Sequence, residues 1–205
     1  MFEKSLSLAV GVILLASTAF GTTLVPGDTV NADVVSAAGW TLLADTGQLN
    51  ATAATFTGVG ESWVYSDSVT GGLDFVYQFK NNGTSTDPAE RITASSFAGW
   101  TVNAGYVLGL DNPPNLISLS ANGAVVGFEF TPGSFNVLPG ETTDLLVVET
   151  NATDYKSGQF SIQDGSTATL DAFEPSTLAP EPASLALLGA GLLGFSLLRR
   201  RSNKN

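Results

Sequence analysis

Hydrophobic and polar residues alternate along much of the chain between positions 22 and 173. The clearest case is Leu73–Lys80, LDFVYQFK, which places its leucine and three aromatic residues on one face and mostly polar side chains on the other. This period of two predicts a half-buried strand. Asp144–Thr150 is instead apolar on both faces around its Leu-Leu-Val-Val sequence, which predicts a central strand.

Turn residues predict two hairpins. Ile117–Ser120 and Val125–Phe130 are joined by Ala121-Asn122-Gly123, where we expect a type I′ turn because Asn-Gly readily adopts positive φ angles. Gly158–Gln163 and Ala168–Phe173 flank Asp164-Gly165 in the same way. Further strands are expected at Trp40–Leu43, Ala53–Thr57, Ser62–Ser68, Ile92–Ser96 and Thr101–Leu108.

About ten short strands without an amphipathic helix between them predict an all-β domain over residues 22–173, an antiparallel β-sandwich of immunoglobulin-like or jelly-roll-like type. Residues 174–179, with proline, serine and threonine, are expected to form a linker. The sandwich is expected to be flanked by an N-terminal signal helix and a C-terminal transmembrane helix.

The N-terminal segment 1–21 has the pattern of a secretory signal peptide. An apolar stretch from Leu6 to Phe20 follows Lys4 and ends in small residues. Cleavage is expected after Ala19 or after Gly21, and the alternative is a buried N-terminal helix or strand. The signal peptide implies the Sec translocon and signal peptidase as partners.

The C-terminal segment 180–205 has three parts. Pro180-Glu181-Pro182 precedes an apolar run at 183–198, and Arg199, Arg200 and Arg201 follow. Sixteen helical residues span about 24 Å, slightly less than the ~30 Å hydrocarbon core, so a transmembrane helix is marginal but feasible with snorkelling arginines. The arginines are expected to form a cytoplasmic anchor. Small residues in the helix permit close packing, namely Gly189, Gly191 and Gly194.

This tail resembles the PEP-CTERM sorting signal of Gram-negative bacteria, with Pro180, Glu181, Pro182 and Ser184 as the sorting and processing motif. Some schemes label the same tail as an ice-binding protein C-terminal domain. The resemblance implies an exosortase-like membrane protease as partner, an exopolysaccharide setting, and an inner-membrane-anchored precursor that reaches the cell surface or extracellular matrix. The alternative is an ordinary C-terminal anchor helix.

Two strand-flanking segments of the body resemble bacterial immunoglobulin-like surface sandwiches. The first is the strand that ends in Asn81-Asn82-Gly83, and the second is Val137–Thr143 before an apolar strand. This resemblance bears on the fold class alone.

Charge and composition restrict the chemistry of the body. The whole chain has a net charge of −11, with neither His nor Cys. Residues 22–179 hold 17 acidic residues against only Lys80, Arg91 and Lys156, a net charge of −14. This charge argues against a nucleic-acid partner. Without His and Cys, the common nucleophilic triads and zinc sites are excluded, and we assign no catalytic residues.

Carboxylates and aromatic residues leave weaker possibilities. Asp87 and Glu90 lie close enough in sequence for a glycosidase pair, although a solvated loop beside Arg91 is the simpler interpretation. Ca²⁺ is the one cofactor considered, although the chain has no Asp-x-Asp-x-Asp-Gly sequence. Four loop carboxylates are its candidate ligands: Asp67, Asp111, Asp154 and Asp164. Six aromatic residues are candidates for either a sugar-binding platform or the core: Trp40, Trp63, Trp100, Tyr65, Tyr106 and Tyr155.

These observations predict an exported, non-catalytic protein of the cell envelope or extracellular matrix, structural or adhesive in role. The alternatives are a carbohydrate- or ice-binding module and, less favoured, a carboxylate-dependent glycosidase. Regular threonine ranks of the kind that ice binding needs are not evident, because Ala51–Thr57 holds only a fragment of such a pattern.

Overall fold

The computed structural model describes residues 20–109 and 112–177. Most of the predicted signal peptide, the predicted transmembrane segment 183–198 and the sorting residues from Pro180 to Arg201 lie outside this part of the chain. Within the described ranges the regular structure consists of strands alone, and no helix is long and apolar enough to cross a membrane.

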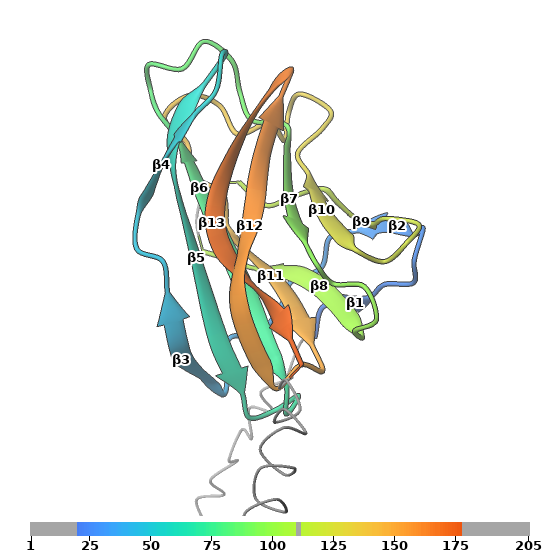
Figure 1. The fold of residues 1–205 in the computed structure, drawn as a ribbon. Helices are drawn as coiled ribbons and strands as arrows, with labels where there is room; N and C mark the ends of the chain where they lie inside the picture. Colours follow the sequence, from blue (N-terminus) through green and yellow to red (C-terminus); the bar gives the residue numbers. More distant parts are fainter. Residues whose placement is uncertain (1–19, 110–111, 178–205) are drawn as a thin grey trace, which may run out of the picture.

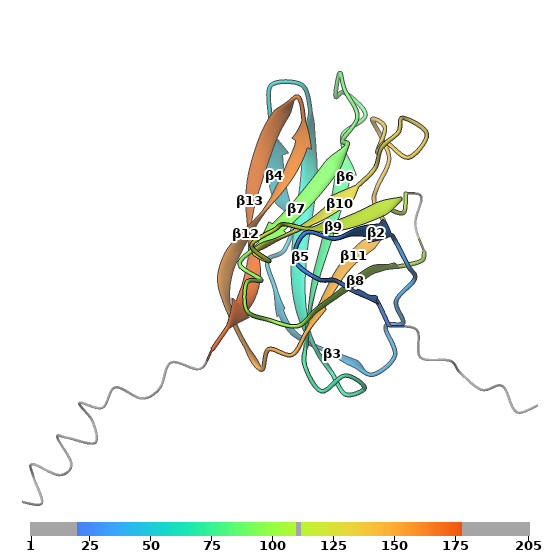
Figure 2. The same cartoon turned by 90° about the vertical axis from the view of Figure 1, so that its right-hand side faces the viewer.

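Two sheets pack face to face and enclose the core (Figures 1 and 2). The first sheet has the order β1 (Thr22–Thr23), β8 (Val102–Val107), β11 (Leu145–Thr150), β6 (Leu73–Asn81), β5 (Thr57–Asp67) and β3 (Trp40–Asp45), with β4 (Leu49–Thr52) also paired to β5. The second has the order β13 (Ser166–Ser176), β12 (Asp154–Asp164), β7 (Arg91–Ser95), β10 (Val125–Glu129), β9 (Leu116–Leu119) and β2 (Thr29–Asn31). Every pairing between these strands is antiparallel, so the predicted all-β, two-sheet architecture is confirmed.

The alternation along β6 determines which face enters the core. Phe75, Tyr77 and Phe79 are buried between the sheets, as their spacing predicted. Tyr77 packs on Phe160 of the second sheet with ring centroids 5.5 Å apart, and its hydroxyl donates to the Phe173 carbonyl at 3.2 Å. Burying an aromatic or aliphatic side chain of this size stabilises a fold by about 1.5–3 kcal/mol, so this row fixes how the two sheets pack.

The central position of β11 also agrees with the prediction from its sequence. The strand lies between β8 and β6, and Leu146, Val147 and Val148 are fully buried. Leu146 and Val148 face the second sheet, whereas Val147 belongs to a smaller apolar cluster on the opposite face. Both faces of this strand are therefore covered.

Both predicted hairpins are present, but the first turn differs from the prediction. Gly123 has a positive φ of 70°, whereas Asn122 is not among the residues with positive φ, so the turn is not type I′. Asn122 instead accepts hydrogen bonds on its side-chain oxygen from the Ala124 N–H at 3.1 Å and from the Ser120 hydroxyl at 2.8 Å. These side-chain hydrogen bonds hold the turn in another conformation.

Several strand boundaries differ from the prediction; β5, for example, begins at Thr57 rather than at Ser62, and β12 begins at Asp154 rather than at Gly158. Residues 53–56, expected within a strand, form the connection between β4 and β5, where Phe56 turns into the core. Thr57, the last residue of that predicted segment, begins β5. β13 continues to Ser176, so the first three residues of the predicted linker pair with β12, and Pro175 is buried opposite Tyr155.

Candidate functional site

A chain segment covers part of the outer face of the first sheet, the face turned away from the second sheet. Residues 33–39, here called the crossing segment, run from the β8 edge to β3 at the opposite edge. On the β8 side the Val35 N–H donates to the Tyr106 carbonyl at 2.8 Å, and the Val35 side chain packs with Val76 and Val147. One end of the outer face is therefore covered, and the other end lies open to solvent.

Three carboxylates meet at the covered end, where β5 and β11 finish and β6 begins (Figure 1). Asp67 is the last residue of β5, and Asp74 and Glu149 are directly opposite each other in the register of β6 and β11. One carboxylate oxygen from each of the three lies within 4.8 Å of the others, and all three residues are buried. We call these residues the acidic cluster.

The members of the acidic cluster differ in their hydrogen bonds. Glu149 accepts the Gly21 N–H at 2.9 Å. Asp67 accepts the N–H groups of Val69 at 2.7 Å and Thr70 at 3.3 Å, which orders the turn between β5 and β6. Asp74 has no exposed surface, and neither of its carboxylate oxygens has a hydrogen-bond partner.

The environment of Asp74 disfavours its charge. Burial is the main cause that raises its pKa to about 8, and the neighbouring carboxylates of Glu149 and Asp67 contribute to this rise. Trp40 lowers this pKa by a smaller amount, but its Nε1–H does not reach hydrogen-bond geometry, so Asp74 remains without a donor. Burial also raises the pKa of Glu149, an effect that the Gly21 hydrogen bond opposes.

The basic side chains of the described residues lie elsewhere. Arg91 pairs with Glu129 at 3.0 Å and Lys156 with Glu174 at 3.1 Å, both on the second sheet. Lys80 is exposed near the far end of β6. In the part of the chain that the structure describes, no basic side chain therefore pairs with the acidic cluster. Its hard oxygen donors are of the kind that bind Ca²⁺ or Mg²⁺.

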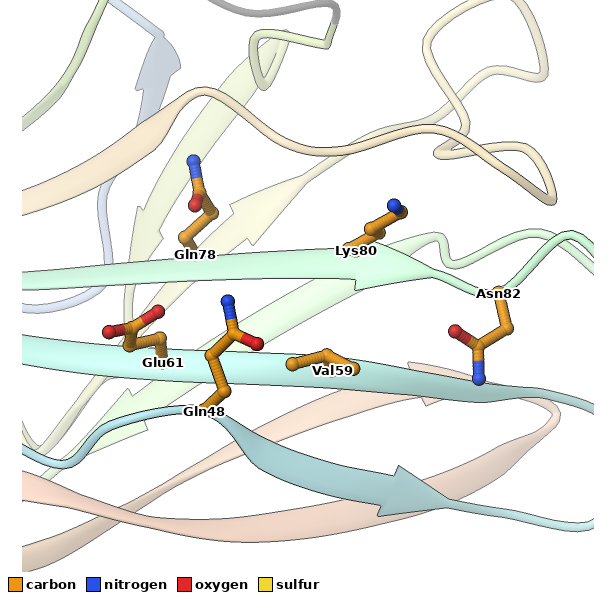
Figure 3. Close-up of a pocket in the computed structure, with 6 residues that line it drawn as sticks. All are labelled: Gln48, Val59, Glu61, Gln78, Lys80 and Asn82. Carbon is orange, nitrogen blue, oxygen red and sulfur yellow. The ribbon is translucent and has the colours of Figure 1, made fainter.

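A polar groove of about 240 Å³ lies at the open end of the same face (Figure 3). Glu61 and Val59 project from β5 and Gln78 and Lys80 from β6, and Gln48 and Asn82 complete the lining. Burial raises the pKa of Glu61, and the nearby Asp45 raises it further. The groove offers several hydrogen-bond donors and acceptors to a polar ligand.

The predicted calcium ligands are not brought together as a set. Asp67 belongs to the acidic cluster, but Asp154 accepts from the Ser176 hydroxyl at 3.2 Å and Asp164 ends β12 at a hairpin tip. Asp111 lies outside the described residues. Sequence reasoning missed Asp74 and Glu149. The available signal was an acidic residue within the otherwise apolar strand of Glu149, because a charge in a doubly covered strand needs a partner.

The possible glycosidase pair lies at a loop. Asp87 and Glu90 are half-buried, and Glu90 accepts from the Asn136 amide at 3.3 Å. Both residues contribute to a raised pKa at Asp164, after the larger effect of burial. Neither residue lines the groove or the hollow of about 300 Å³ beside Asp67.

The aromatic candidates are divided among three places rather than joined in one platform. Trp40 stacks on Tyr65 with ring centroids 4.8 Å apart, and both pack with Trp63 against the small apolar cluster of the outer face. Trp100 and Tyr155 pack against the main core. Tyr106 is half-buried on β8.

Comparison with known proteins identifies the tail. The PEP-CTERM protein-sorting motif matches residues 178–201, which confirms the resemblance drawn from Pro180-Glu181-Pro182 and the arginine cluster. No curated protein and no solved structure matches the chain. The motif indicates an exosortase-sorted extracellular protein, made as a membrane-anchored precursor and processed by a membrane protease to an exported form.

Proposed function

We propose that this chain is a non-catalytic structural or adhesive protein of the cell surface or extracellular matrix, in an exopolysaccharide setting. The sorting motif at 178–201 is the observation that carries the proposal. The described body supports it: a two-sheet sandwich with a filled core provides a rigid unit for display outside the cell. Its strong negative charge favours solubility at high local concentration.

Two measurements test the sorting and display steps. Mass spectrometry of the native C-terminus is expected to find cleavage near Pro182, because the motif is a processing signal. An intact Arg199–Arg201 end would instead support simple anchoring. Deletion of residues 180–205 is expected to change the distribution of the protein among membrane, periplasm and medium. An identical distribution of the deleted and full chains would remove the basis of the proposal.

A second candidate function, carbohydrate binding, is favoured by the groove at the open end. Its polar lining lies on the same face of β5 as Trp63, two residues beyond Glu61, and sugars combine hydrogen bonds with aromatic stacking when they bind proteins. A glycan array with the full chain tests this candidate. Binding that falls in Lys80→Ala and Gln78→Ala but persists in Lys156→Ala would support it, and a blank array would exclude the glycans displayed.

A further inference from the structure

We propose that the acidic cluster of Asp67, Asp74 and Glu149 is a calcium-binding site. The three carboxylates converge within 4.8 Å from three different strands of one sheet. Both oxygens of the fully buried Asp74 lack a hydrogen-bond partner. Buried polar groups are normally hydrogen-bonded, and an unpartnered carboxylate facing two others indicates a missing cation.

The position of the cluster in the sheet strengthens this inference. Like charges directly opposite each other on antiparallel strands destabilise a sheet, and Asp74 and Glu149 occupy such a pair between central strands. Their row continues to Tyr65 on one side and Asn103 on the other. Val or Thr at these two positions would fit the sheet without a buried charge. Asp74 and Glu149 therefore destabilise the metal-free sheet, and a bound cation offsets that cost.

The donors suit calcium better than other divalent ions. They are all carboxylate oxygens, which favour hard cations, and all three residues are buried rather than in open water. Ca²⁺ tolerates irregular sets of six to eight oxygens, whereas Mg²⁺ requires near-octahedral geometry and gives up its water reluctantly. Backbone carbonyls or water would supply the remaining oxygens.

Asp67 lines a surface hollow of about 300 Å³ together with Gly39 and Leu73, next to the residues that flank Asp74. Gly39 approaches closely: a Cβ built on it would lie 3.3 Å from Oδ1 of Asp67. Calcium bound to all three carboxylates would join the β5–β6 turn to β11, which holds the Gly21 segment through Glu149.

Calcium-dependent stability tests the proposal. The full chain, purified in mild detergent and stripped with EDTA, is melted with no metal, with Ca²⁺ or with Mg²⁺. Ca²⁺ is expected to raise Tm by about 5–10 °C at one hundred times Kd, and Mg²⁺ by clearly less. Extracellular calcium modules have Kd values of about 10⁻⁴–10⁻³ M, which sets the range of the titration. No rise with Ca²⁺, or an equal rise with both ions, would overturn the proposal.

Variants separate binding from a structural role. Asp74→Asn keeps the side-chain shape but removes a charged ligand, so we expect the calcium affinity to fall at least about tenfold while the metal-free protein gains stability. Glu61→Gln, the control, removes a carboxylate from the open end of the same face and is expected to keep the full calcium response. An unchanged calcium response in Asp74→Asn would contradict the assignment.

A spectroscopic readout covers the case in which a variant folds poorly. Tb³⁺ replaces Ca²⁺ at oxygen sites, and nearby indole rings sensitise its luminescence. Trp40 is close enough to Asp74 to lower the pKa of that residue, so its ring is a suitable sensitiser. We expect sensitised Tb³⁺ emission that Ca²⁺ displaces, and its loss in Asp67→Asn as well as in Asp74→Asn. Absence of sensitised emission from the wild-type chain would count against the site. This inference concerns the body of the protein and does not depend on how the tail is processed.

Discussion

The two ends of the outer face of the first sheet hold similar residues in different surroundings. At the open end, Glu61 and Lys80 line a groove that solvent reaches. At the covered end, Asp74 and Glu149 lie on the same pleated face but are buried, and burial is the largest cause of the raised pKa of each. The cost of a carboxylate on this face therefore depends on how far its surroundings bury it.

The largest effect is expected from adding a charge to each end. Val147→Asp places a carboxylate against Val35 and Val76 in the covered apolar cluster. We expect it to lower the free energy of unfolding by about 3 kcal/mol or more. Val59→Asp makes the same change at the open end, directly opposite Lys80, and is expected to stay within about 1 kcal/mol. Urea denaturation measures both. Equal losses would show that the two ends do not differ in effective burial.

A smaller effect is expected at the crossing segment itself. Gly39 has a φ of 89° and lies against Ser68 and Asp67, so Gly39→Ala combines backbone strain with a steric clash and should cost about 2 kcal/mol. Gly47→Ala is the matched control, because Gly47 also has a positive φ but no atom near its would-be Cβ. Its cost should be about 1 kcal/mol. If Gly47→Ala loses as much stability as Gly39→Ala, the packing of the crossing segment against Asp67 contributes nothing to the stability of the fold.

The smallest effect concerns pH at the open end. Burial and Asp45 raise the pKa of Glu61 above its ordinary 4.5, so the folded state holds this proton more tightly than the unfolded state. That contribution is fully present below about pH 4.5 and is lost as pH rises through the folded-state pKa. Relative to Glu61→Gln, the wild-type chain should therefore lose stability between pH 4 and pH 7, by less than about 0.5 kcal/mol because solvent screens the site. A gain in stability of the wild-type chain relative to Glu61→Gln over this pH range would contradict a raised pKa at Glu61.

Local sequence patterns predicted well which strands and faces form the core of this fold. The alternation of Leu73–Lys80 identified the core face of β6, and the doubly apolar Asp144–Thr150 identified a central strand. Both signals are local, because they depend on which side chains share a face. The short strands β1, β2 and β4 were missed because two to four residues are too few to show a period.

The crossing segment over the outer face of the first sheet and the acidic cluster were not predictable from local patterns. Asp74 occupies a polar position of an alternating strand, which ordinarily faces water, yet it has no exposed surface in the folded protein. Asp67 was a calcium candidate from its loop position, but its partners come from β6 and β11, 7 and 82 residues further along. Such contacts depend on the order of strands in the sheet, which no short stretch of sequence encodes.

The hydrogen bond from Gly21 to Glu149 gives the export step a structural consequence. If signal peptidase cuts after Ala19, Gly21 becomes the second residue of the exported chain and still supplies the N–H that holds Glu149. A cut after Gly21 would remove that donor and leave Glu149 without it. The choice between two scissile bonds that lie two residues apart would then alter the carboxylate environment of the finished protein, and N-terminal sequencing of the exported form would reveal which version the cell displays.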